Sequence, residues 1–269
     1  MEGVGASSVA FRSNALNRGT EQNHSERIKL VDSEAVANDF IESMKVAQTF
    51  SERVAAFQLV QQMYFRAGLT NDTKVDMRVT KHHLLDTTDV LISKPDRRVD
   101  FTVTLVRDGI EGLPAESLFN EEIVAMRNEG LRLAEVSCVA SAVPENDRRK
   151  CMEKLVAMIG LAIHTARRRK VDRLLLAVHP RHAKVYRRMF GCVACSDVRD
   201  YAAVEGNPAV LCMHDFKRLD ETGYSLYEKI YGTQYRPWQF DGTKMTAPER
   251  AYFREQVSAE ADSFVPMAA

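Results

Sequence analysis

Hydrophobic residues recur at every third or fourth position over two long stretches of the chain. In residues 50–66 they are Phe50, Val54, Phe57, Val60 and Tyr64. This spacing predicts an amphipathic helix with one core-facing stripe, and Gly68 favours its end. The same spacing over residues 148–170 predicts a longer helix. Its buried stripe comprises Met152, Leu155, Ile159, Ile163 and Ala166.

Other stretches show the patterns of β-strands. Residues 99–105 alternate between hydrophobic and polar side chains, which is typical of a half-buried strand. With the short apolar run 90–92 and the turn residues between them, they predict an antiparallel hairpin. Residues 133–141 and the nearly continuous apolar run 171–178 predict strands on either side of the long helix. This strand–helix–strand order predicts two parallel strands joined by a right-handed crossover.

Turn and capping residues delimit the remaining elements. A short helix is expected to end at Gly130, and another to run from Pro180 to Gly191. Residues 192–215 read as a second β-hairpin, with its turn at EGNP. Further along the chain, TAPERAYFREQ begins with capping-box spacing and predicts a last helix. The flanking hairpins are antiparallel, so the sheet should be mixed.

The composition is that of a globular protein, with 45% hydrophobic residues among 269. We expect one α/β (α+β) domain over residues 28–220, a disordered polar tail at 1–27 and a helical appendage at 221–269. No run reaches the roughly 18 to 20 apolar residues that span a bilayer, and the N-terminus lacks a signal-peptide core. We therefore expect a cytoplasmic protein. Five cysteines in a chain of this length do not make a disulfide framework.

The charge is unevenly placed although the net charge is zero. Residues 143–191 carry 13 Lys or Arg against 4 Asp or Glu. This basic sector suggests an acidic partner, such as a phosphate-bearing cofactor, a carrier protein or nucleic acid. The alternative is that these charges are the solvated faces of two helices.

Three segments resemble one known family. They are GLPAESLFNEEIVAMRNEGLRLAEVSCVA at 112–140, VHPRHAKVYRRMFG at 178–191 and RDYAAVEGNPAVL at 199–211. In this order and spacing they resemble the N-acyl amino acid synthases, relatives of the GNAT acyltransferases and of the acyl-homoserine-lactone synthases. The resemblance covers about residues 50–216. It implies a GNAT-like fold, with a mixed, mostly antiparallel twisted sheet flanked by helices.

The resemblance also implies a reaction. The donor would be an acyl thioester, usually a long chain on acyl carrier protein, and the acceptor the α-amine of an amino acid. The acyl-phosphopantetheine thioester would be a co-substrate, and no tightly bound cofactor is expected. The product would be an N-acyl amino acid, whose acyl chain allows transient membrane contact.

Amide formation from a thioester needs a base for the amine, donors for the carbonyl and a proton for the thiolate. Glu135 and Ser137 lie two apart on one expected strand and share a face. Glu135 is the candidate base, or alternatively a structural partner of an arginine. The backbone N–H groups of Ser137, Cys138 and Val139 are the candidate donors, at the place where GNAT enzymes have a bulged strand.

The segment 178–201 supplies further candidates. Tyr186 matches the GNAT tyrosine that protonates the leaving thiolate, or else is a packed core aromatic. His182 lies four residues before it on the same expected helix. His179 is either a helix cap or a substrate contact. Arg199 and Tyr201 either hold the acceptor's carboxylate or brace the sheet.

The segment before the long helix reads PENDRRK and contains no glycine. Many coenzyme-A-dependent GNAT enzymes have a glycine-rich loop there, whose N–H groups cradle the pyrophosphate. Arg148, Arg149 and Lys150 remain as candidates for binding a single phosphopantetheine phosphate. Carrier protein is therefore favoured over coenzyme A as the donor.

Several alternatives stay open. His179 and His182 with Cys192 and Cys195 have zinc-ligand types. However, cysteines three apart on a strand point to opposite faces, so no metal is expected. Nucleic-acid binding is not expected, since the basic helices carry no recognition motif. A non-catalytic GNAT-like module, an acyl-homoserine-lactone synthase and an acyl-coenzyme-A-dependent N-acyltransferase are the remaining alternatives.

Overall fold

The computed structural model describes residues 40–72, 74–144 and 146–257. In these residues one sheet of eight strands runs in the order β1-β2-β3-β4-β5-β8-β6, with β7 paired to β8. Within it β4 and β5 are parallel, and the other pairs are antiparallel. The predicted mixed, mostly antiparallel sheet is confirmed. The strands are β1 Met44–Val46, β2 Thr88–Ser93, β3 Phe101–Arg107, β4 Leu133–Ser141, β5 Arg173–Val178, β6 Val193–Ala194, β7 Arg199–Tyr201 and β8 Asn207–Asp215.

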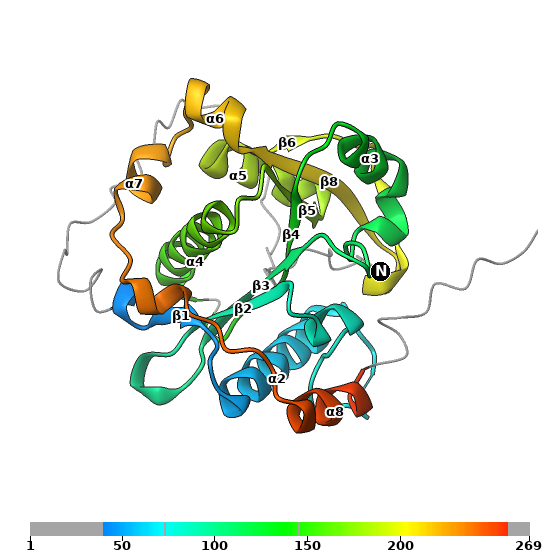
Figure 1. Cartoon of the computed structure of the whole chain (residues 1–269), viewed down its shortest axis with the longest axis vertical. Coiled ribbons are helices and arrows are strands. Elements are labelled where there is room, and N and C mark those ends of the chain that lie inside the picture. Colours follow the sequence, from blue (N-terminus) through cyan, green and yellow to red (C-terminus); the bar gives the residue numbers. More distant parts are fainter. Residues whose placement is uncertain (1–39, 73, 145, 258–269) are drawn as a thin grey trace, which may run out of the picture.

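Helices cover both faces of this sheet (Figure 1). Helix α4 packs on one face together with α5, and α2, α8 and α3 lie on the other. None of the helices in the described part of the chain is long and apolar enough to cross a bilayer. The helices are α2 Phe50–Ala67, α3 Glu116–Asn128, α4 Arg148–Arg168, α5 Pro180–Phe190, α6 Phe216–Thr222, α7 Tyr227–Gly232 and α8 Ala247–Glu255. Short 3-10 turns span Lys81–Leu84, Pro95–Arg97, Ala202–Val204 and Pro237–Phe240.

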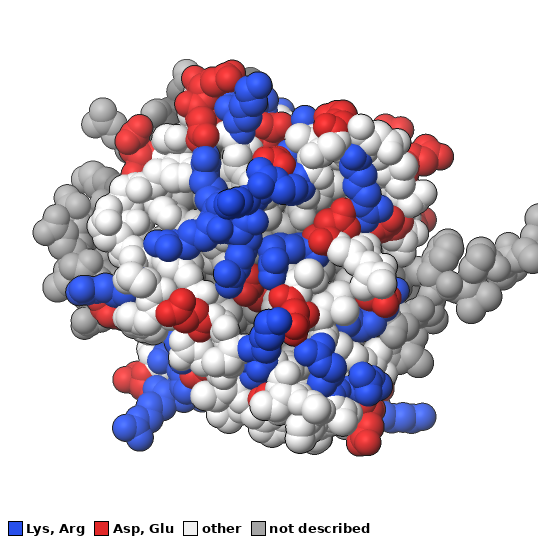
Figure 2. All heavy atoms as spheres, in the orientation of Figure 1, with Lys and Arg blue, Asp and Glu red and all other residues white. Residues whose placement is uncertain are grey.

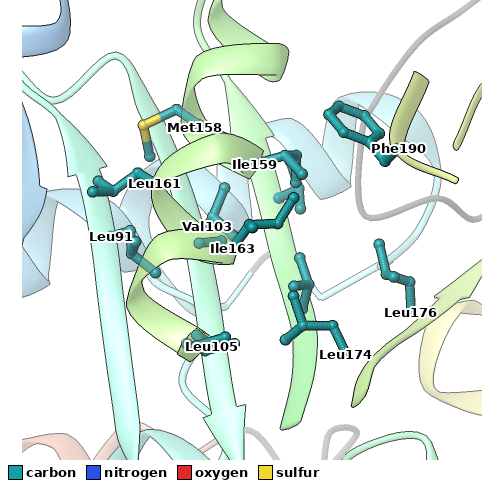
Figure 3. Close-up of a cluster of buried hydrophobic side chains, with 14 of the residues drawn as sticks. Leu91, Val103, Leu105, Met158, Ile159, Leu161, Ile163, Leu174, Leu176 and Phe190 are labelled. Atoms are coloured by element: carbon teal, nitrogen blue, oxygen red, sulfur yellow. The ribbon is translucent and has the colours of Figure 1, made fainter. Parts of the chain in front are cut away.

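The predicted stripe of the long helix forms the centre of one hydrophobic core. Leu155, Ile159, Ile163 and Ala166 of α4 are at most 3% exposed, while Met152 is partly buried. Figure 3 shows Ile159 and Ile163 facing side chains of β3 and β5. The strand–helix–strand unit therefore holds together through its apolar faces, as the 3.6-residue period indicates.

Capping residues explain where the helices begin and end. Thr49 and Glu52 form a capping box at the start of α2, and Gly68 ends it in the left-handed region. Pro180 occupies the first turn of α5, and Gly191 ends it with φ 66°. The sequence signals at Gly68, Pro180 and Gly191 predict these ends, whereas the capping box at the start of α2 was not predicted.

Two expectations about the elements are wrong, and one strand was not expected. Phe50 was placed in the core-facing stripe but is 40% exposed, and its ring contacts Tyr252 and Phe253 of α8. The expected single strand after Gly191 is broken into β6 and β7, so Cys192 and Cys195 flank β6. Strand β1 has no counterpart in the prediction, because three residues are too few to show a period.

The aromatic residues after α6 pack along α4. The Tyr235 hydroxyl donates to the Ala157 carbonyl at 3.2 Å, and Arg167 Nε donates to the Tyr231 hydroxyl at 3.0 Å. Gly160 permits this approach, since a Cβ there would lie 3.1 Å from the Tyr235 hydroxyl. These contacts tie the C-terminal segment to the core, whereas the expected tail at 1–27 lies outside the described residues.

Candidate functional site

Strand β4 is bulged in its middle. Its register with β3 shifts between two pairs, Thr102 with Ala140 and Thr104 with Ser137. Cys138 lies in this shift and has φ 48°, a conformation that non-glycine residues rarely adopt. A bulge interrupts the ladder of hydrogen bonds and re-aims the local backbone. The candidate donors at Ser137, Cys138 and Val139 therefore lie on an irregular strand, whereas the Val139 side chain is buried in the core.

The pairing of β4 with β5 stops immediately before this bulge. Its register runs from Leu133 with Arg173 to Glu135 with Leu175. Beyond that point β5 stays paired to β8 as far as Val178, and β4 stays paired to β3. Glu135 is thus the last residue of β4 that pairs with β5, and the two parallel strands are no longer paired at the bulge that follows.

A cavity of about 760 Å³ opens at this point. Its floor is formed by residues 135–138 of β4, with Ala177 of β5 and Ala209 of β8. Segments around Leu113 and Tyr201 and the stretch before β2 make its walls. This volume lies within the roughly 300–1,000 Å³ of ligand pockets. Glu135, Ser137, Cys138 and Tyr201 therefore share one cavity.

Glu135 is buried in this floor at 3% exposure. Its Oε2 accepts a hydrogen bond from the Ala115 N–H at 2.7 Å. Burial raises the pKa of Glu135 to about 8; the Ala115 hydrogen bond opposes this shift, and nearby Glu116 adds to it. A carboxyl group with such a pKa changes charge near neutral pH, which suits a general base.

An arginine clamp holds the loop that carries the Ala115 N–H. Arg127 of α3 donates to Asp108 at 2.6 and 2.8 Å and to Glu116 at 2.5 Å. Glu116 in turn accepts from the Leu113 N–H at 3.1 Å. Gly112 has φ 66°, and a Cβ there would lie 2.3 Å from Glu116 Oε2, so this turn requires glycine.

The tyrosines near the cavity keep their protons. The Tyr201 hydroxyl donates to the Pro114 carbonyl at 3.0 Å, and burial followed by the charge of Glu135 raises its pKa. Burial likewise raises the pKa of Tyr64, and nearby Cys138, Tyr201 and Tyr186 add to that shift. Tyr186 itself is 2% exposed, packs on Phe190 and is not among the lining residues. The acid role of Tyr186 stays a prediction.

The two histidines and Arg199 lie outside the cavity lining. His179 caps α5, since its Nδ1 accepts the Arg181 N–H at 3.2 Å, and this favours the cap over the substrate contact. His182 is partly buried, and burial lowers its pKa to about 4. Arg199 donates to Glu122 at 2.5 Å and to the Leu118 carbonyl at 2.7 Å, so the structure favours the bracing interpretation.

Charged side chains are arranged differently at the two ends of α4. At its C-terminal end Arg167 pairs with Asp220, and Arg169 with Asp89. At its N-terminal end Arg148, Arg149 and Lys150 are exposed, and Arg149 pairs with Glu153. Figure 2 shows basic side chains running together over the region of α4, with acidic ones among them. Part of the basic sector is thus held in ion pairs within the fold, and the part at the start of α4 is exposed to solvent.

The described residues contain no group of three or more His, Cys, Asp or Glu side chains placed to hold a metal ion. The five cysteines are free thiols.

A protein-family model, that of the N-acyl amino acid synthase FeeM, matches residues 55–215. The chain belongs to this family. It is an acyltransferase. The match covers the sheet from β2 to β8, and with it Glu135, the bulge and the cavity floor.

Solved structures with this fold include FeeM itself, an N-acyl amino acid synthase from uncultured soil microbes. It has a TM-score of 0.52 at 22% identity, covering 63% of this chain and 92% of that one. An acyl-CoA N-acyltransferase from Pseudomonas aeruginosa has a TM-score of 0.41 at 17% identity, with coverages of 64% and 97%. The acyl-homoserine lactone synthase BjaI has a TM-score of 0.44 at 13% sequence identity, covering 76% of this chain and 92% of that one. No curated protein sequence matches the chain.

The sequence interpretation of this FeeM-family chain missed part of the cavity wall. Tyr64 lines it from α2, and Arg78, Lys81 and His82 line it from the segment between α2 and β2. These residues lie outside the three segments that carry the resemblance. A local signal for the last three is the group of basic residues at 78–83, which follows apolar Met77.

Proposed function

We propose that this protein transfers a long-chain acyl group from an acyl carrier protein thioester to the α-amine of an amino acid, giving an N-acyl amino acid. The observation that carries the proposal is Glu135, a buried carboxyl with a pKa of about 8 on the floor of a cavity, directly before a β-bulge. Family membership adds the reaction class.

The chemistry proceeds by addition and elimination. The amine nitrogen attacks the thioester carbonyl, and Glu135, directly or through a water, accepts the proton that the nitrogen loses. Backbone N–H groups around Cys138 stabilise the negative charge on the carbonyl oxygen. The C–S bond then breaks, and the thiolate leaves and is protonated. Tyr186 is the proposed proton donor for that step, and the amide and the free carrier thiol are the products.

The start of α4 favours carrier protein over coenzyme A. Asp147 caps this helix by accepting the Lys150 N–H at 3.1 Å, so a carboxylate already lies where a pyrophosphate would bind. Arg148 and Lys150 extend into solvent. We expect them to meet the acidic surface of a carrier protein and its single phosphate.

Mass spectrometry of lipids from cells producing the protein tests the proposal. A new N-acyl amino acid is expected with the wild type and not with Glu135→Gln, and its mass identifies both substrates. Purified enzyme with acylated carrier protein and mixed amino acids should give the same product. A homoserine lactone product, or no acylated product in cells or with the purified enzyme, would contradict the proposal.

A further inference from the structure

Arg78 is a buried cation on the wall of the cavity. It is 6% exposed, and its Nη2 donates to the Ala203 carbonyl at 2.9 Å. Its guanidinium carbon lies 5.2 Å from the centre of the Tyr64 ring. Within residues 40–72, 74–144 and 146–257, no carboxylate forms an ion pair with it.

The other buried cations of the described chain are paired. Arg53 is 4% exposed and lies 3.1 Å from Glu249, and Lys154 is 2% exposed and pairs with Asp100. A buried charge without a partner is costly, because it loses its hydration and gains no counter-charge. Among the described residues Arg78 differs from both in lining a cavity without a carboxylate partner, and an anionic ligand in that cavity can supply the missing charge.

Glu135 and Arg78 both line this cavity, Glu135 from β4 and Arg78 from the segment between α2 and β2. Each acts on Cys138 and on Tyr201: Glu135 raises the pKa of both groups, and Arg78 lowers it. No ion pair joins these two residues, and the Ala115 N–H donates a hydrogen bond to Glu135. The lining of one cavity therefore includes both a carboxyl group and a guanidinium.

We propose that Arg78 binds the α-carboxylate of the acceptor, so that the acceptor's amine is directed towards Glu135 and the bulge. This inference rests on the proposed function. In an α-amino acid one carbon separates the amine from the carboxylate, so fixing the carboxylate also fixes the nucleophile. The guanidinium fork matches a carboxylate in shape and charge. Arg78 takes the role that Arg199 cannot fill, since Glu122 and the Leu118 carbonyl occupy that guanidinium.

The first test uses the wild-type enzyme with three acceptors: the amino acid identified from the product, its carboxamide and its decarboxylated amine. We expect kcat/KM for the free acid to exceed the other two by about 100-fold, as for a buried charge pair. Equal use of acid and carboxamide would overturn the proposal without any variant.

The second test compares Arg78→Met with Arg78→Lys. The Met variant should lose the preference for the acid through a higher KM for that acceptor, with the carboxamide rate and the donor KM unchanged within about threefold. The Lys variant should restore part of the preference. Lys81→Met is the matched control: Lys81 lines the same cavity but pairs with Glu111 at 3.3 Å, and its loss should leave the acid preference in place.

Two outcomes separate this inference from the proposed function. If Arg78→Met instead raises the KM of the acyl donor, Arg78 binds the donor's phosphate and the carboxylate assignment is wrong. If the wild type acylates no amine, calorimetric binding of free amino acids is the remaining test. If the wild type binds the amino acid and Arg78→Met does not, the carboxylate site is supported although the acyl transfer fails. If both proteins bind the amino acid equally, the carboxylate site and the proposed function are both refuted. Thermal melting of each variant checks its fold.

Discussion

At the scale of single residues, the site depends on an environment that holds a carboxyl group near its point of ionisation. Glu135 is 3% exposed, and the loop before α3 reaches its carboxyl group through the Ala115 N–H. One N–H from Ala115 stabilises its charged form, and Glu116 opposes it. Because burial is the largest of these effects, the group is a stronger base than an exposed glutamate.

Glu135→Gln should lower turnover at least about tenfold, as expected for the loss of a general base. In the wild type, kcat/KM per unprotonated amine should rise with pH as Glu135 loses its proton, up to about pH 8. That rise should be missing in the variant. Glu121→Gln, on the exposed side of α3, is the control and should keep it. Unchanged turnover in Glu135→Gln would remove this residue from the mechanism.

The same burial makes stability depend on pH. The pKa of Glu135 is about 8 in the folded protein and about 4.5 when unfolded, so the unfolded chain loses this proton first. The free energy of unfolding should therefore fall as pH rises from about 4.5 to about 8. Denaturant melts of wild type and Glu135→Gln should show the variant gaining relative stability across this window. A difference that is constant with pH would contradict the assigned pKa.

At the scale of elements, α5 is joined to the final strands by a turn that only glycine fits. Gly191 has φ 66°, and a Cβ there would lie 2.5 Å from Leu219 Cδ2 and 3.2 Å from Tyr224. Leu219 and Tyr224 belong to α6 and the segment after it. This close approach lets the C-terminal segment pack against the end of α5, on the side of the sheet that holds α4.

Gly191→Ala should therefore lower the melting temperature strongly, because backbone strain and a steric clash add together. Gly68→Ala is a matched control, since Gly68 ends α2 at φ 69° with no atom within 4 Å of the added Cβ. It should cost about 1 kcal/mol from the left-handed backbone alone, and Gly191→Ala about 2 to 4 kcal/mol. If both variants lose a similar amount of stability in thermal or denaturant unfolding, α6 moves aside easily and the predicted clash is absent.

At the scale of the whole molecule, the cavity and the exposed basic residues of α4 lie on different faces of the sheet. The cavity opens on the face that carries α2 and α3, beside the bulge. The exposed basic residues lie at the start of α4, which follows β4 and packs on the other face. A thioester that is bound at the start of α4 would have to reach the point after Glu135 where β4 and β5 cease to pair.

Replacing Arg148, Arg149 and Lys150 together with serine should raise the KM for acylated carrier protein about fivefold to tenfold and weaken its salt dependence. The KM for a short acyl-pantetheine thioester should not change, because that donor has no acidic surface. Lys217→Ser with Lys229→Ser removes exposed charges on α6 and α7 and serves as control. Equal effects on both donors would argue against a carrier-protein surface at α4.

Local patterns predicted most of the elements because each is encoded in consecutive residues. The stripe of α4 and the apolar run of β5 have periods that require burial on one face or on both. Strand β1 was not predictable in this way because it is only three residues long and its partner β2 lies more than 40 residues later. The break between β6 and β7 was not predictable either, since both short strands pair with β8. The ring contacts of Phe50 involve α8, about two hundred residues later.

By itself the sequence determined the α/β class, the central strand–helix–strand unit and the family, because periodicity, caps and motif order are local properties. It also singled out Glu135, Ser137, Cys138 and Tyr201, which the fold brings to one cavity. Long-range packing set the bulge at Cys138, the pKa of Glu135 and the pairing of Arg199 with Glu122, and it left Arg78 without an ion-pair partner among the described residues. Each of these depends on which distant groups exclude water or supply a counter-charge, and that depends on three-dimensional packing.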